Sequence, residues 1–199
     1  MKSSIDRIIE KSSNRFPSRN EALQVFSVVN FIVFSWTFYR IFWNIPSWLE
    51  HMRIDNILVT AAYILSFALL ESAIIFTILY MISWLLPKRL FRDQFVSLSC
   101  SVVILLGFGA FLFQRNVKVL YRLSYYELLI YLVFIILGVL LSTLIFSYLF
   151  KRFGILPRWI QIIAERMTIF NYLYVPLGIL GLLVVLVRNS INLIIGFIQ

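Results

Sequence analysis

Apolar residues along the chain are gathered into five long blocks separated by short polar stretches. The blocks cover approximately residues 22–42, 57–86, 95–113, 125–150 and 168–187. About 20 apolar residues in an α-helix are enough to cross a hydrocarbon core of roughly 30 Å, and each block reaches about that length. The pattern predicts an all-α polytopic membrane protein, a bundle of five transmembrane helices.

Two further segments have the pattern of amphipathic interfacial helices, with apolar and charged residues on opposite faces. They are residues 1–20, which we interpret as a cytoplasmic N-terminal segment, and residues 157–167, just before the fifth span. Residues 21–199 are expected to form a single transmembrane domain. The apolar tail 191–199 is too short to cross a membrane, so it either extends the fifth span beyond a break at Arg188, Asn189 and Ser190 or lies on the surface.

Helix starts are marked by the pattern Ser-x-x-Glu, in which the serine and the glutamate each satisfy a free backbone N–H group. This capping box occurs at Ser18–Glu21, Ser47–Glu50 and Ser124–Glu127. The first and third boxes predict the starts of spans one and four. The second, after Pro46, predicts a short helical turn in the loop that follows span one.

The composition excludes an ordinary soluble domain. Of the 199 residues, 61% are apolar and 14% are charged, against roughly 45–50% and 25% in average soluble domains. The formal net charge is +9, but the basic residues lie between the apolar blocks, where they hold loops at an anionic membrane surface. We therefore expect a lipid bilayer, and no nucleic acid, among the partners. Cys100 is the only cysteine, which excludes an intrachain disulfide and a cysteine-based metal site.

Lys and Arg are distributed unequally between the two sides of the membrane. With the N-terminus inside, the inner segments carry 12 of them and the outer segments carry 6. Because basic residues favour the cytoplasmic side, we predict a multi-pass protein of the plasma (inner) membrane with a cytoplasmic N-terminus and an extracytoplasmic C-terminus. If one of the five spans were false, the later half of this topology would invert.

Glu71 is the charged residue that lies deepest within a span, near the middle of span two. An ionised carboxylate in hydrocarbon is costly, so Glu71 should be protonated, paired or turned to a polar cavity. Its helical face carries mostly apolar residues, which indicates a packed face between helices. Two interpretations stay open: a proton-coupled or lipid-headgroup site, or a carboxyl hydrogen-bonded to a polar residue of another span, such as Asn30 or Asn171.

Small residues recur four positions apart, a spacing that lets transmembrane helices approach closely. Examples are Ala62 with Ser66 and Ala73 with Thr77. Packing within the bundle is the simpler interpretation of these pairs, and a docking face for a partner subunit is the alternative. Glycines such as Gly178 and Gly181 are likewise expected to serve packing.

The basic turn at Lys88, Arg89 and Arg92 predicts contact with anionic lipid headgroups or with an acidic patch on a partner, although a simple positive-inside anchor also fits. His51 is the lone histidine, and it lacks the further His or Cys ligands that a metal site needs, so it is expected to be a solvated loop residue. No catalytic residue, metal ligand or cofactor site is predicted.

Three features of the sequence together resemble one known arrangement. They are the turn "LLPKRLFRDQF" between spans two and three, five spans with the N-terminus inside, and the amphipathic segment before the last span. The arrangement is the membrane region that precedes the extracytoplasmic domain in sulfatase-type phosphoglycerol or phosphoethanolamine transferases. In that family the metal ligands and the Thr or Ser nucleophile belong to the soluble domain, which this sequence does not contain. The resemblance therefore implies no catalytic residue here, and activity only if a separate chain supplies the missing domain.

These observations favour an integral membrane accessory or anchoring subunit without catalytic activity of its own, serving an envelope-lipid or glycan enzyme. We expect a membrane-protein partner or a homo-oligomer. The alternative is a small transporter or channel subunit that uses Glu71. A third hypothesis, an intramembrane lipid enzyme, would need a nucleophile and base within mutual reach, and only Glu71 or the peripheral Glu50, His51 and Asp55 offer such groups.

Overall fold

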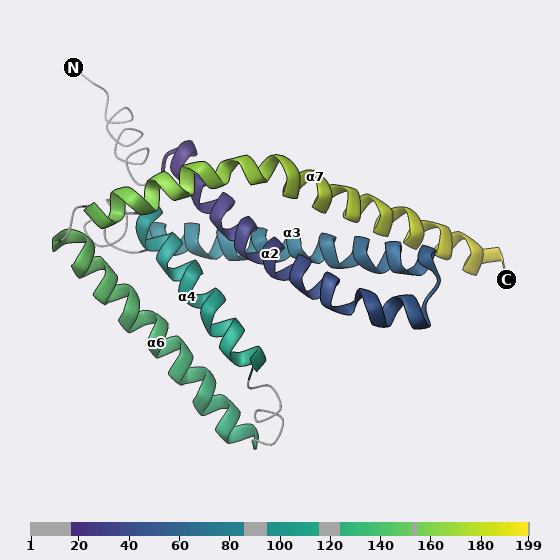
Figure 1. The fold of residues 1–199 in the computed structure, drawn as a ribbon, viewed down its shortest axis with the longest axis horizontal. Coiled ribbons are helices and arrows are strands. Elements are labelled where there is room, and N and C mark those ends of the chain that lie inside the picture. The colour runs from purple at the N-terminus through teal and green to yellow at the C-terminus, as the bar shows by residue number, and fades with distance from the viewer. Residues whose placement is uncertain (1–16, 86–94, 116–123, 153–154, 199) are drawn as a thin grey trace. The chain divides into compact units, whose positions relative to one another are not determined.

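The structure, a computed structural model, describes residues 17–85, 95–115, 124–152 and 155–198. All regular structure in these ranges is α-helical. The helices are α2 (Arg19–His51), α3 (Ile54–Leu85), α4 (Phe95–Arg115), α6 (Tyr125–Arg152) and α7 (Ile155–Ile198). Each contains a stretch that is long and apolar enough to cross a membrane, so the predicted all-α polytopic fold is confirmed (Figure 1).

Two of the three predicted capping boxes are present. The Ser18 N–H donates to Glu21 Oε2 at 2.7 Å, and the Glu21 N–H donates to Ser18 Oγ at 3.3 Å. At the start of α6, the Ser124 N–H donates to Glu127 Oε2 at 2.7 Å, and the Glu127 N–H donates to Ser124 Oγ at 3.4 Å. These reciprocal bonds satisfy backbone donors that have no partner within the helix.

The second box, Ser47–Glu50, does not start a helix, because α2 continues without interruption through Pro46 to His51. Proline inside a helix removes one backbone donor and crowds the preceding turn, but transmembrane helices tolerate it because neighbouring groups and local adjustments satisfy the freed backbone groups. The Ser47 carbonyl oxygen instead lies 2.9 Å from His51 Nδ1. Only Met52 and Arg53 separate α2 from α3.

The separate interfacial helix expected at residues 157–167 and the fifth span are parts of one helix. α7 has 44 residues and includes Pro176, which corresponds to about 66 Å at 1.5 Å per residue. It also runs through Arg188, Asn189 and Ser190, where a break was expected, so the tail extends the fifth span. The change from apolar to polar residues signals a change of environment, and it does not require the backbone to bend.

The chain divides into two compact units. One contains the described residues of Phe26–Thr77 and Met167–Gln199, where most of α2, most of α3 and the later part of α7 run beside one another (Figure 1). The other contains the described residues of 1–25 and 78–166, where α4 and α6 are in contact.

In the second of these units, the first half of α4 forms a buried core. Every residue from Phe95 to Val103 is buried. Ser97 Oγ donates to the Pro157 carbonyl oxygen at 3.2 Å, which ties α4 to the beginning of α7. The core combines apolar side chains with serines whose small size lets helices approach.

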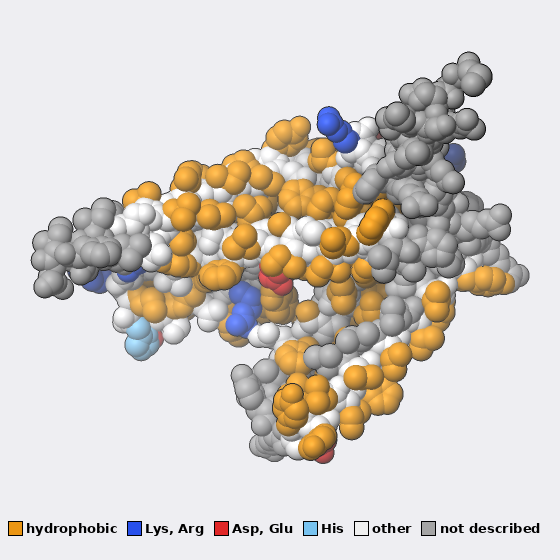
Figure 2. Space-filling model, turned by 180° about the vertical axis from the view of Figure 1, so that it is seen from behind, with side chains coloured by type: hydrophobic (Ala, Val, Ile, Leu, Met, Phe, Trp, Pro, Cys, Tyr) orange, Lys and Arg blue, Asp and Glu red, His pale blue; other side chains and the backbone are white. Residues whose placement is uncertain are grey.

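Large apolar side chains cover much of the outer surface of the helices (Figure 2). Phe134 is 69% exposed, and the aromatic residues near helix ends are also exposed, including Trp43, Trp84, Tyr125 and Trp159. A surface of this kind is unfavourable in water. It suits a multi-pass protein whose apolar faces contact lipid and whose Trp and Tyr side chains lie near the interface.

Candidate functional site

In the first unit, α7 approaches α3 closely at two glycines. A Cβ atom added at Gly181 would be 2.6 Å from the Ala62 carbonyl oxygen and 3.2 Å from the Ser66 nitrogen. One added at Gly178 would be 2.7 Å from Leu69 Cβ. The small residues Ala62 and Ser66 thus contact glycine on another helix of the same chain, which confirms the packing interpretation for this pair.

A polar contact joins α2 to α7 in the same unit. Asn30 Nδ2 donates to Asn171 Oδ1 at 2.9 Å, and Asn171 Nδ2 donates to Ser27 Oγ at 2.7 Å. Ser27 and Asn30 are fully buried. We call these three residues the amide clamp. Asn30 Oδ1 has no hydrogen-bond partner among the described residues.

Aromatic side chains extend the contact along α2 and α7. Phe34 and Tyr174 are stacked, with ring centroids 5.0 Å apart and planes 7° apart. Phe31 and Phe170 lie beside them, also with centroids 5.0 Å apart. The polar bonds and the stacked rings together fix how α2 and α7 are rotated about their axes.

Glu71 lies on an exposed part of α3. It is 17 residues from the first residue of α3 and 14 from the last, so about 21 Å of helix separates it from the nearer end. Phe67, Leu70 and Ile74 surround it and are 65%, 48% and 59% exposed. We call these four residues the Glu71 face.

The hydrogen bond from Glu71 to Asn30 or Asn171, one of the two interpretations of the sequence, is absent, and these two asparagines bond to each other. Glu71 has no hydrogen-bond or ion-pair partner within the described residues. The face of α3 that carries Glu71 is exposed, whereas the sequence indicated that it would be packed between helices. At 3.6 residues per turn, Glu71 is about 180° around α3 from Ala62 and about 140° from Ser66, so it points away from α7.

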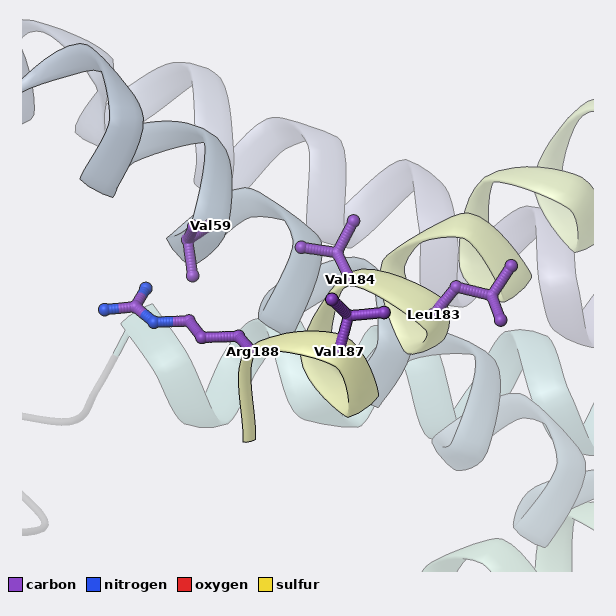
Figure 3. A pocket seen from close by; sticks show the side chains of 5 residues that line it. All are labelled: Val59, Leu183, Val184, Val187 and Arg188. Carbon is purple, nitrogen blue, oxygen red and sulfur yellow. The ribbon is translucent and has the colours of Figure 1, made fainter. Parts of the chain in front are cut away.

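An apolar pocket of about 410 Å³ lies between α3 and α7, away from Glu71. It is lined by Val59, Leu183, Val184, Val187 and Arg188. In Figure 3 the Arg188 side chain runs alongside Val59, and its guanidinium lies at the end of the pocket away from Leu183. Sequence reasoning placed Arg188 in a break after the fifth span and did not connect it with Val59.

The other predicted residues form no common site. His51 is exposed at the end of α2, and the described residues contain no group of three or more His, Cys, Asp or Glu that could hold a metal ion. Cys100 is buried within α4. The basic turn of Lys88, Arg89 and Arg92 lies outside the described residues, as does most of the N-terminal segment 1–20.

Comparisons with family models, with curated proteins and with solved structures find no match for this chain. The candidate site is therefore defined by its own chemistry. It consists of one carboxyl on an exposed apolar helix face, backed by a tightly packed three-helix unit. The sequence identified Glu71 as unusual and offered Asn30 and Asn171 as possible partners for it, but it did not show that the two asparagines pair with each other.

Proposed function

We propose that this protein is a noncatalytic accessory or anchoring subunit of a membrane assembly, and that the Glu71 face binds a transmembrane helix of its partner. The observation that carries the proposal is the exposure of Glu71 among Phe67, Leu70 and Ile74, near the middle of α3. A charged side chain at that depth costs about 3 kcal/mol or more when it faces lipid. A partner that covers it removes this cost.

The chemistry of the face favours a partner helix with a Lys or Arg side chain at the same depth. Glu71 is the only charged side chain between Asp55 and Lys88, so α3 itself offers no counter-charge near it. An acidic and a basic side chain that pair away from water satisfy each other's charge and hydrogen bonds. The apolar neighbours of Glu71 would pack around the pair and exclude lipid.

The position of Glu71 also bears on the transport hypothesis. A titrating group in a transport pathway needs contact with a polar cavity. The pocket between α3 and α7 is lined by apolar side chains and Arg188, and Glu71 does not contribute to it. This arrangement favours partner binding over transport by the single chain.

We further propose that the protein resides in the cytoplasmic (inner) membrane, with its N-terminus inside and its C-terminus outside. The twofold excess of basic residues in the inner segments supports this orientation. The resemblance to the membrane region of sulfatase-type transferases suggests the partner's class: an envelope-lipid or glycan enzyme with an extracytoplasmic catalytic domain.

The test is to purify the tagged protein from its native membrane in a mild detergent and to identify bound proteins by mass spectrometry. We expect a stoichiometric membrane-protein partner that Glu71→Asp retains and Glu71→Leu loses. Leu144→Ala, on the exposed surface of α6, is the matched control and should retain the partner, since Leu144 is 60% exposed.

Two results would contradict the proposal. Retention of the partner by Glu71→Leu would show that this face is not the contact. A homo-oligomer with no other protein bound would favour the transporter hypothesis instead. In that case Glu71→Gln should abolish a pH-dependent flux while leaving the protein in the membrane.

A further inference from the structure

We infer that the pocket between α3 and α7 binds an anionic phospholipid, with an acyl chain along the valines and the phosphate at Arg188. This site is separate from the Glu71 face and does not depend on the proposed function. The pocket is an open groove of about 410 Å³ and not an enclosed cavity.

The pocket walls match a hydrocarbon chain. Val59 contributes from α3, and Leu183, Val184 and Val187 contribute from one side of α7. Three of these side chains are largely exposed: Leu183 (52%), Val184 (42%) and Val187 (58%). Inside a membrane, side chains exposed in this way must be covered by lipid or by protein.

Arg188 supplies the charge that selects the headgroup. Its guanidinium lies at one end of the apolar pocket (Figure 3), and the side chain has no hydrogen-bond or ion-pair partner among the described residues. Asp55, one helical turn before Val59, is paired with Arg53 at 3.3 Å. A phosphate diester carries the complementary charge and accepts the paired hydrogen bonds that a guanidinium donates.

The occupant therefore has two parts, an acyl chain and an anionic phosphate, held at one end of the α3–α7 contact. Gly178 and Gly181 hold the two helices together beside the pocket, so the walls are set by backbone packing. A zwitterionic phospholipid would fill the same walls but would present a cationic group near Arg188. We expect it to bind more weakly.

The experiment is native mass spectrometry of the full chain in detergent, titrated with phosphatidylglycerol or phosphatidylcholine of matched acyl chains. The wild type should bind phosphatidylglycerol more tightly. Arg188→Gln should weaken that binding about five-fold, the effect of one basic residue near an anionic lipid surface, and leave phosphatidylcholine unchanged. Arg158→Gln, at an exposed position elsewhere on α7, is the matched control and should behave as wild type.

A second variant tests the acyl-chain part. Val184→Phe, at a partly exposed position, fills the pocket and should weaken binding of both lipids without unfolding the protein, as judged by circular dichroism. Equal phosphatidylglycerol affinities of wild type and Arg188→Gln would overturn the inference. So would an equal loss in Arg158→Gln, which would indicate nonspecific surface charge, or full displacement of the lipid by glycerol 3-phosphate, which would indicate a site for the phosphate alone.

Discussion

Gly181 lies against the backbone of Ala62, so that a Cβ atom at position 181 would be 2.6 Å from the Ala62 carbonyl oxygen. A helix carbonyl cannot move aside as a flexible side chain can. The distance between α3 and α7 at this point therefore depends on the absence of a single methyl group.

Substitution of Gly181 by alanine should destabilise the protein, because α3 and α7 must separate to admit the methyl group. We expect a loss of roughly 1–3 kcal/mol, the usual cost of overpacking. Thermal unfolding in detergent, followed by far-ultraviolet circular dichroism, measures it. Gly138→Ala is the control, since nothing lies within 4 Å of a Cβ atom there. Equal transition temperatures for the two variants would contradict the prediction.

The amide clamp should show energetic coupling between Asn30 and Asn171. Asn171→Leu removes the acceptor of the Asn30 amide and the donor to Ser27. Such bonds between transmembrane helices contribute about 0.6 to 1.7 kcal/mol. The double variant Asn30→Leu/Asn171→Leu should lose less than the sum of the two single variants, because no buried amide is then left without its partner. Additive losses in the same unfolding assay would rule out the coupling.

Tyr174 should contribute through its ring rather than its hydroxyl. The ring stacks on Phe34 and lies 5.7 Å from Phe170, centroid to centroid, and an aromatic pair adds about 0.5–1.5 kcal/mol beyond its burial. We expect Tyr174→Phe to unfold like the wild type and Tyr174→Ala to unfold at a clearly lower temperature. If Tyr174→Phe lost as much stability as Tyr174→Ala, the hydroxyl would be the important group.

Cys100 should be unreactive in the folded protein, because its side chain is only 2% exposed in the buried first half of α4. A thiol-reactive fluorophore should label it slowly in mild detergent and rapidly after heating. Ser99→Cys, a neighbouring position that is also buried, should behave in the same way. Leu106→Cys, at a position that is 42% exposed, is the reactive control. Fast labelling of Cys100 without heating would show that this core opens readily.

Hydrophobic length was enough to predict the five stretches that can span a membrane, because a membrane requires long apolar segments whatever their packing. It did not predict where α2 ends or where α7 begins and ends. The boxes at Ser18 and Ser124 located helix starts, since their hydrogen bonds involve only neighbouring residues. The same pattern at Ser47 led to the wrong prediction of a separate helical turn, because α2 already runs through that stretch. The polar residues at 157–167 also led to a wrong prediction, that of a separate helix. Polar residues indicate the environment of a side chain and do not show where a helix ends.

The candidate site was predictable in part. Glu71 was recognisable from its isolation in an apolar block, but its direction depends on which side of α3 meets α7. The side of α3 that meets α7 is determined by the close approach at Gly178 and Gly181, more than a hundred residues later in the chain. The pairing of Asn30 with Asn171 and the position of Arg188 beside Val59 depend on the same helix rotation, which local sequence patterns do not contain.

The amide clamp also affects how the protein is made. Asn30 and Asn171 are 141 residues apart in the chain, and synthesis at 5–20 residues per second separates their emergence from the ribosome by roughly 7 to 28 s. During that interval Ser27 and Asn30 are already synthesised while their partner on α7 does not yet exist. α2 is therefore in the membrane or in the insertion machinery before α7 exists. Until then the Asn30 side-chain amide must form hydrogen bonds with water or with another chain. Final packing of this unit is consequently completed only after α7 has been synthesised.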